Sequence, residues 1–116
     1  MNAREEVLKR GRFEVDQTAR KVADLERIIR EFEVIASDLD RRIKNEEART
    51  GIEDPNHFAY SSFASSARAR RDKLHASTEG LKAQLEAARE ERDAAVERLS
   101  RIEARARESA VPTRGT

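Results

Sequence analysis

Few side chains in this 116-residue chain could carry out acid–base or metal chemistry. The chain has two histidines, His57 and His75, and no cysteine. Neither histidine has a partner group at a helical spacing that suits metal binding or proton transfer. Glutamate pairs such as Glu46 and Glu47 are explained by solvated helix faces, and there is no glycine-rich phosphate loop or nucleophile elbow. We therefore expect no catalytic residue, no cofactor and no metal site, and we expect that the protein is not an enzyme.

The composition indicates long helices instead of a compact core. Charged residues make up 41% of the chain, hydrophobic residues 37% and aromatic residues only 4%. The 24 Lys and Arg residues almost balance the 23 Asp and Glu residues, which argues against a nucleic-acid partner. No apolar run approaches the length of about 18 residues that a membrane span needs, and we expect no signal sequence, because the first residues include no apolar region. We expect a soluble cytoplasmic protein that does not insert directly into a membrane.

Two runs of heptads predict an all-α fold in which two long helices form an antiparallel coiled-coil hairpin. In the first run, the two seam positions are filled by Leu8, Val15, Val22, Ile29, Ala36 and Ile43, and by Gly11, Thr18, Leu25, Phe32, Leu39 and Glu46. In the second run they are filled by Tyr60, Ala67, Leu74, Leu81, Ala88, Ala95 and Ile102, and by Ala64, Arg71, Thr78, Leu85, Arg92, Leu99 and Ala106. The second run is weaker, because two arginines and a threonine occupy seam positions.

A single break separates the two runs. Gly51 suits the left-handed residue that follows a helix, and Asp54 before Pro55 suits an N-cap followed by proline in the first turn. We expect a hairpin over residues 1–108, with helices at about 3–49 and 55–108, a turn at about 50–54 and a flexible C-terminal tail at 109–116. Each helix would be on the order of 70–80 Å long.

The register between the helices has two possible settings. Folding about the break would place Ile43 against Tyr60 and Leu39 against Ala64, and a slip of one heptad is the alternative. In either setting, we expect the layers of Gly11 and Thr18 to face small or polar residues of the second helix. Such layers bury little apolar area. We therefore expect a hairpin that is firm in its middle and loose at its open end.

The aromatic residues near the turn are the first candidates for partner binding. Tyr60 falls on the seam and is expected to pack in the core, whereas Phe58 falls on the outer face and Phe63 flanks the seam. A two-helix hairpin cannot bury an outward phenylalanine by itself, so Phe58 is a candidate docking residue.

Other candidates lie along both helices. Ile28 and Ile35 widen the apolar stripe of the first helix, and they either broaden the hairpin interface or accept a third helix. Residues 67–73 form the densest positive run. We interpret it as a solvated face paired with acids of the first helix, or as a contact for an acidic protein surface. Phe13 and Val34 point outward. The candidate partner-binding residues are His57, Phe58, Phe63, Ile28, Ile35, Arg68, Arg70, Arg12 and Phe13.

One stretch resembles a known family. Residues 51–60 read G-I-E-D-P-N-H-F-A-Y, after a basic start from Arg4 to Phe13 and before an R-R-D-K-L segment at 70–74. Over residues 1–108 the chain resembles the flagellar export protein FliJ family, above all its alphaproteobacterial branch. The resemblance rests mainly on the 51–60 run.

The resemblance implies a mechanical role. Family members resemble the central stalk of rotary ATPases: they insert into the ring of the flagellar export ATPase and contact the cytoplasmic domain of the export gate membrane protein. They are also described as escorts for export chaperones. By analogy, residues 4–12 and 99–107 would face the ATPase, and the middle and tip would face the gate. The implied location is the cytoplasm, peripherally at the flagellar basal body on the inner membrane.

Two functions of other classes are alternatives. One is a coiled-coil finger that acts in the secondary channel of RNA polymerase, for which Glu53 and Asp54 would be the acidic tip residues. Such factors carry a separate globular domain for anchoring, and we expect none in this sequence. The other is a coiled-coil holdase chaperone whose open helix ends grip clients, although the β-strands by which such proteins assemble are missing.

Overall fold

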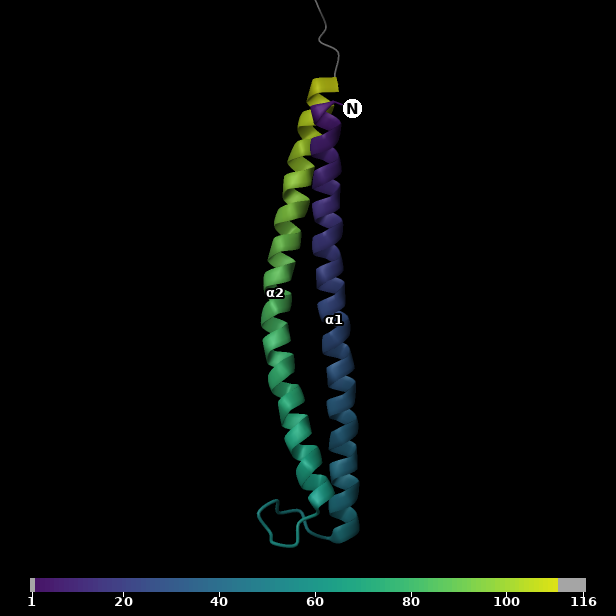
Figure 1. Cartoon of the computed structure of the whole chain (residues 1–116), viewed down its shortest axis with the longest axis vertical. Helices are drawn as coiled ribbons and strands as arrows, with labels where there is room; N and C mark the ends of the chain where they lie inside the picture. Colours follow the sequence, from purple (N-terminus) through teal and green to yellow (C-terminus); the bar gives the residue numbers. More distant parts are fainter. Residues whose placement is uncertain (1, 111–116) are drawn as a thin grey trace, which may run out of the picture. The chain divides into compact units, whose positions relative to one another are not determined.

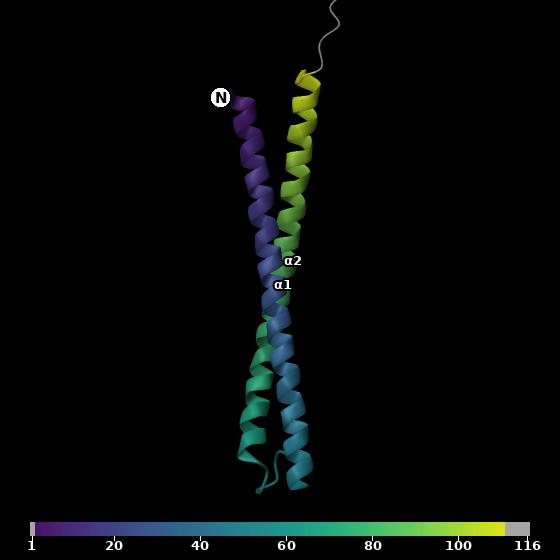
Figure 2. The ribbon, with the colours of Figure 1, turned by 90° about the vertical axis from the view of Figure 1, so that its right-hand side faces the viewer.

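The computed structural model describes residues 2–110 and contains two long helices, α1 (Ala3–Thr50) and α2 (Ser62–Ala110), joined by residues 51–61 (Figure 1). Both views show continuous helices whose chain directions oppose each other (Figures 1 and 2). The predicted all-α antiparallel hairpin is confirmed. Contacts divide the chain into two bodies. The tip body comprises residues Leu25–Ala83, and the terminal body joins α1 up to Asp24 to α2 from Gln84 onward.

The tip body holds most of the large buried aliphatic side chains. Its buried residues are Leu25, Ile29, Ala36, Leu39 and Ile43 from α1, and Ala64, Ala67 and Thr78 from α2. All of them occupy predicted seam positions. Leu74 is half-buried and packs against the cluster of Leu39, Ile43 and Ala67. The Thr78 hydroxyl donates a hydrogen bond of 2.8 Å to the Leu74 carbonyl, which satisfies this buried polar group within its own helix.

The terminal body has a thinner core. Its buried residues are Gly11, Val22, Leu85, Ala88 and Ala95, again at predicted seam positions. An ion pair between Glu14 and Arg98 and another of 3.6 Å between Lys21 and Glu91 join the two helices here. Small side chains fill much of this seam, so burial of apolar area contributes less than in the tip body.

The register differs from the one first expected. Leu39 and Ile43 cluster with Ala67, and the Arg71 guanidinium lies 2.8 Å from the Asp40 carboxylate. These contacts match the alternative setting, one heptad away from the pairing of Ile43 with Tyr60. The reason lies in the connection, because α2 begins at Ser62 instead of residue 55. Each position of α1 therefore faces residues that lie one heptad further along α2 than first expected.

The surroundings of Gly11 also differ from the expectation. A Cβ atom placed on Gly11 would lie 3.1 Å from Leu99 Cδ1 and 3.5 Å from Ile102 Cδ1. Gly11 therefore faces two large aliphatic side chains, not the small or polar residues that were predicted. The absence of a side chain lets the two helices approach closely at this layer.

The segment between the helices is longer than predicted because its own polar groups form turns. Gly51 has a φ of 75° and its N–H donates to the Glu47 carbonyl at 2.9 Å, so its predicted left-handed role is confirmed. Asp54 is not the N-cap of α2. Its carboxylate accepts a hydrogen bond from the Asn56 N–H at 2.9 Å, and the cap is Ser61, whose hydroxyl accepts from the Ala64 N–H at 3.2 Å.

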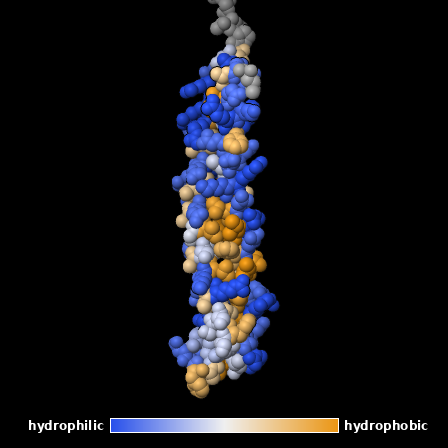
Figure 3. Space-filling view, in the orientation of Figure 1, coloured by the Kyte–Doolittle hydropathy of each residue, from blue (hydrophilic) through white to orange (hydrophobic). Residues whose placement is uncertain are grey.

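The other end of α2 extends slightly past its predicted limit. The helix continues to Ala110, so residues 109 and 110 of the expected flexible tail are helical. The rest of that predicted tail, residues 111–116, lies outside the described residues. Neither helix, as far as the structure describes them, includes a stretch apolar enough to cross a bilayer. The space-filling view shows a mainly hydrophilic surface on which apolar side chains gather in a limited area (Figure 3).

Candidate functional site

The candidate functional sites of the described residues are exposed surfaces. Across residues 2–110, no three His, Asp or Glu side chains gather in a way that could hold a metal ion. Instead, several large apolar side chains are exposed beside charged ones. They form three groups, one in the connecting segment, one along the tip body and one on the terminal body.

The connecting segment presents an aromatic pair to solvent. Phe58 is 97% exposed and its ring stacks on that of His57, with 4.7 Å between the ring centroids. His57 is itself held in place, because its Nδ1 accepts a hydrogen bond of 3.0 Å from the Ala59 N–H. The outward position predicted for Phe58 is confirmed, although a loop and not a helix carries it. The segment thus displays a large apolar surface at a defined place.

Two glutamates of α1 anchor this segment. The Tyr60 hydroxyl donates a hydrogen bond of 2.7 Å to Glu47 Oε2, and the Ser61 hydroxyl donates one of 3.0 Å to Glu46 Oε1. Tyr60 is half-buried, and burial together with the Glu47 carboxylate raises the pKa of its phenol. A hydrogen bond from Arg49 lowers the pKa of Glu46.

The role of these two glutamates was missed from the sequence. Glu46 and Glu47 are half-buried and bonded across the hairpin, so a solvated face does not explain them. Glu46 occupies a seam position of the first heptad run, and an acid on an apolar seam was the available signal.

The basic run of α2 divides between paired and unpaired side chains. Arg71 lies 2.8 Å from Asp40 and 3.2 Å from Asp72, and its hydrogen bond with Asp40 raises the pKa of its guanidinium. Arg68 lies 3.8 Å from Glu47. These contacts confirm pairing with acids of the first helix. Arg70 is exposed and has no ion-pair partner in the described part of the chain.

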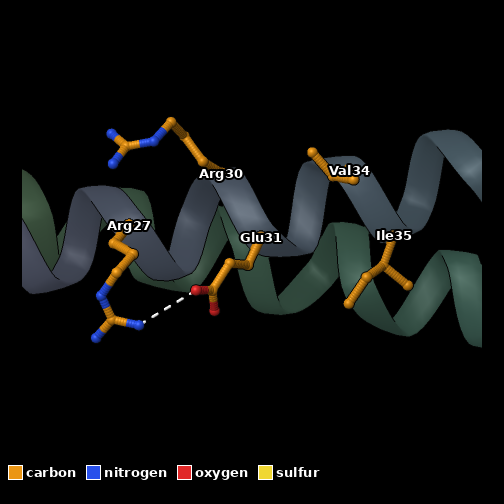
Figure 4. A pocket seen from close by; sticks show the side chains of 5 residues that line it. All are labelled: Arg27, Arg30, Glu31, Val34 and Ile35. Atoms are coloured by element: carbon orange, nitrogen blue, oxygen red, sulfur yellow. Dashed lines mark hydrogen bonds and ion pairs between the residues drawn. The ribbon is translucent and has the colours of Figure 1, made fainter.

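The tip body carries apolar side chains on its surface. Ile28 is half-buried, Ile35 and Phe63 are exposed, and Val34 is 69% exposed. A groove of about 180 Å³ is lined by Leu39, Arg42, Phe63, Ser66, Ala67 and Arg70. Farther along α1, an open hollow of about 590 Å³ is lined by Arg27, Arg30, Glu31, Val34 and Ile35. Figure 4 shows Ile35 projecting on the same side of α1 as Glu31 and Arg27, which form an ion pair of 3.2 Å.

The terminal body has one exposed aromatic side chain on a charged face. Phe13 is 62% exposed and lies in a hollow of about 400 Å³. The other lining residues are Glu6, Lys9, Arg10, Arg12 and Asp16. Arg12 and Phe13, both predicted from the sequence, therefore form one surface.

The structure thus brings some predicted residues together in pairs: His57 with Phe58, Phe63 with Arg70, and Arg12 with Phe13. Comparisons with protein-family models, with curated proteins and with solved structures find no match to this chain.

Proposed function

We propose that this protein is a helical-hairpin component of the flagellar type III export apparatus that binds the export ATPase ring and the cytoplasmic domain of the export gate. In this role it couples ATP hydrolysis to the export of flagellar proteins. The proposal rests on the FliJ-like run at residues 51–60 and on the antiparallel two-helix fold. Export chaperones are further partners that the resemblance suggests.

The observation that carries the proposal is the exposure of Phe58. The run that resembles the family forms the connecting segment, and within it Phe58 is 97% exposed while Tyr60 and Ser61 are anchored to α1. An exposed aromatic side chain on an anchored segment is a typical interface anchor, because little conformational entropy is lost on binding. We assign this segment to the gate.

The terminal body supplies a surface for the ATPase ring. Its hollow around Phe13 combines an aromatic side chain with Lys9, Arg10 and Arg12. Arginine and aromatic residues are enriched in protein interfaces, where the cation also directs the approach of an acidic partner. The assignment of this surface to the ATPase follows from the analogy with rotary stalks.

The polymerase-channel alternative is weakened by the geometry of Asp54. Its carboxylate accepts the Asn56 N–H at 2.9 Å and its carbonyl accepts the His57 N–H at 3.1 Å, so this acid shapes the turn. A factor that acts near a catalytic metal needs tip carboxylates that are free to approach it.

Binding measurements with purified partners test the proposal. The full chain is titrated with the export ATPase and, separately, with the cytoplasmic domain of the gate protein. We expect Phe58→Ala to weaken gate binding about tenfold or more without changing the thermal midpoint, as for a central aromatic anchor. Phe13→Ala is the matched control, which should weaken ATPase binding and leave gate binding unchanged. Absence of binding to both partners, or capture of polymerase subunits instead, would contradict the proposal.

A further inference from the structure

The two flanks of the tip body differ in charge. On one flank, acids of α1 face bases of α2: Asp40 pairs with Arg71, and Glu47 with Arg68. On the other flank, Arg42 of α1 and Arg70 of α2 line the same groove. Complementary charges close the first flank, whereas the second flank places like charges across the helix pair, an arrangement that lowers stability.

The acids beside the second flank are already paired with arginines. Glu31, on the same side of α1 as Ile35, forms an ion pair of 3.2 Å with Arg27 (Figure 4). Asp38 forms an ion pair of 2.9 Å with Arg42 and also pairs with Arg41, so one carboxylate serves two guanidinium groups. These contacts lower the pKa of Asp38, chiefly through its hydrogen bond with Arg41. Arg70 has no acidic partner within residues 2–110. A net positive charge therefore remains around the groove.

The same flank carries an apolar track. Ile28, Ile35 and Arg42 follow one another at heptad spacing on α1, so each lies about 10 Å beyond the last along the same face. Phe63, half of whose surface is exposed, lines the groove together with Leu39 and Ala67. Two apolar side chains of α1, Ile28 and Ile35, thus lead along one face to the groove that Arg42, Phe63 and Arg70 line.

We propose that this flank, defined by Ile28, Ile35 and Arg42 of α1 and by Phe63 and Arg70 of α2, binds an acidic amphipathic helix of a partner protein. The track runs along α1 with the spacing that a helix presents on one face, so aliphatic side chains of the partner fit against Ile28, Ile35 and Phe63. Its carboxylates pair with Arg42 and Arg70, which offsets the positive charge that these two residues place at the groove. The inference does not depend on the flagellar role.

The charge selects this occupant over a second copy of the chain. In a symmetric dimer the same flank would meet itself, and the positive surplus around Arg42 and Arg70 would be doubled. Like charges brought together in this way disfavour a partner. An acidic helix gains attraction at the same positions, so the surface discriminates by repulsion as well as by fit.

A designed peptide serves as the probe. It is a helical peptide with Leu at heptad spacing and Glu on both sides of that stripe, compared with an analogue in which every Glu is Lys. Fluorescence anisotropy with the full chain should show binding of the Glu peptide, weaker binding as salt rises, and at least about tenfold weaker binding of the Lys peptide. Methyl NMR should show shifts at Ile28 and Ile35 but not at Ile52 or Ile102.

Matched variants localise the contact. Arg70→Glu and Ile35→Asp should each weaken binding of the Glu peptide about tenfold or more, with helicity unchanged by circular dichroism. Lys44→Glu makes the same charge change at an exposed position of α1 outside the flank and should leave binding unchanged. Phe58→Ala should also leave peptide binding unchanged, so failure of the gate assignment and failure of this inference are distinguishable.

Four results would overturn the inference. They are equal binding of the Lys and Glu peptides, a loss with Lys44→Glu as large as with Arg70→Glu, no binding of the Glu peptide at millimolar concentration, and methyl shifts away from Ile28 and Ile35. Sedimentation equilibrium tests the remaining occupant. Self-association that Ile35→Asp abolishes would assign the flank to a second copy of the chain instead.

Discussion

The hydroxyl of Tyr60 lies 2.7 Å from Oε2 of Glu47, 13 residues earlier in the chain. This hydrogen bond ties the segment before α2 to the last turns of α1. The neighbouring bond from Ser61 to Glu46 acts in the same place, and Ser61 is also the N-cap of α2. The point at which α2 starts is therefore fixed relative to α1, and that point determines which heptads pair.

Alkaline titration should report on this bond. Burial and Glu47 raise the pKa of Tyr60 above its ordinary value of 10.0. A group with a raised pKa in the folded state contributes stability that is fully present below the unfolded value and is lost as pH rises through the folded value. We therefore expect the thermal midpoint to fall at alkaline pH.

The chain has one tyrosine and no tryptophan, so tyrosinate absorbance follows Tyr60 alone. Tyr60→Phe removes the hydroxyl and should cost about 0.5–1.5 kcal/mol of unfolding free energy at neutral pH. It should also remove the part of the alkaline loss that is specific to Tyr60. Ionisation of Tyr60 at the pKa of a short unfolded peptide would show that the bond is absent in solution.

Arg71 should lower the stability of the hairpin and at the same time define its register. It occupies a seam position, its side chain is only 20% exposed, and it pairs with Asp40. Polar seam residues specify register in coiled coils at a cost in stability. We expect Arg71→Leu to raise the thermal midpoint and to let a second register become populated.

Spin labels on exposed sites of α1 and α2 within the tip body would detect this second register as a second distance. The control is Arg70→Leu, a change to the same residue at the neighbouring exposed position, which should leave a single distance. A single distance in Arg71→Leu as well would mean that the anchors at Tyr60 and Ser61 suffice to set the register.

Heptad periodicity accounts for most of the fold. The buried residues from Gly11 to Ile43 and from Ala64 to Ala95 all lie at the seam positions that the heptads predict. The connection could not be predicted as well. Asp54 before Pro55 suits an N-cap and a turn equally well, and in the structure it forms a turn. The start of α2 is set instead by the hydrogen bonds of Tyr60 and Ser61 with Glu47 and Glu46, which lie 13 and 15 residues earlier in the chain.

The candidate surfaces show the same limit. The exposure of Phe58 and Phe13 follows from a hairpin being too thin to cover outward aromatic residues. The groove shared by Arg42 and Arg70 depends on which heptads face each other, and two registers satisfied the apolar pattern. Only the observed register places Arg71 beside Asp40.

The two glycines within the helices should respond oppositely to an added side chain. Nothing lies within 4 Å of a Cβ placed on Gly80, so Gly80→Ala should stabilise the protein by about 0.5–1 kcal/mol through helix propensity. At Gly11 the same atom would crowd Leu99 Cδ1 at 3.1 Å. Gly11→Leu should therefore destabilise by about 1–3 kcal/mol, as overpacked cores do.

Urea unfolding of both variants measures these values. Adding Leu99→Ala to Gly11→Leu provides the control, because it makes room at that layer and should recover part of the loss. Stabilisation by Gly11→Leu alone would show that the helices move apart at this layer at little cost, and that the close approach to Leu99 is unimportant.

Hydrogen exchange should differ between the two bodies. The buried seam of the tip body contains four large aliphatic side chains, Leu25, Ile29, Leu39 and Ile43. That of the terminal body contains two, Val22 and Leu85, beside glycine and alanine. Local opening is easier where less apolar area is buried. We expect amides of residues 5–20 and 88–105 to exchange much faster than those of 29–43 and 64–81, measured by mass spectrometry on the full chain.

The functional consequence of that difference can be tested at Thr18 and Arg92, two half-buried seam residues of the terminal body. The double variant Thr18→Leu, Arg92→Leu adds apolar area there and should slow exchange in the terminal body alone. Ser37→Leu with Lys44→Leu, at exposed positions, is the control and should not slow it. If the proposed ATPase ring requires a hairpin end that yields, the stiffer variant should stimulate ATP hydrolysis less. Uniform exchange along both helices would contradict the first expectation, and full stimulation by a demonstrably stiffer hairpin would contradict the second.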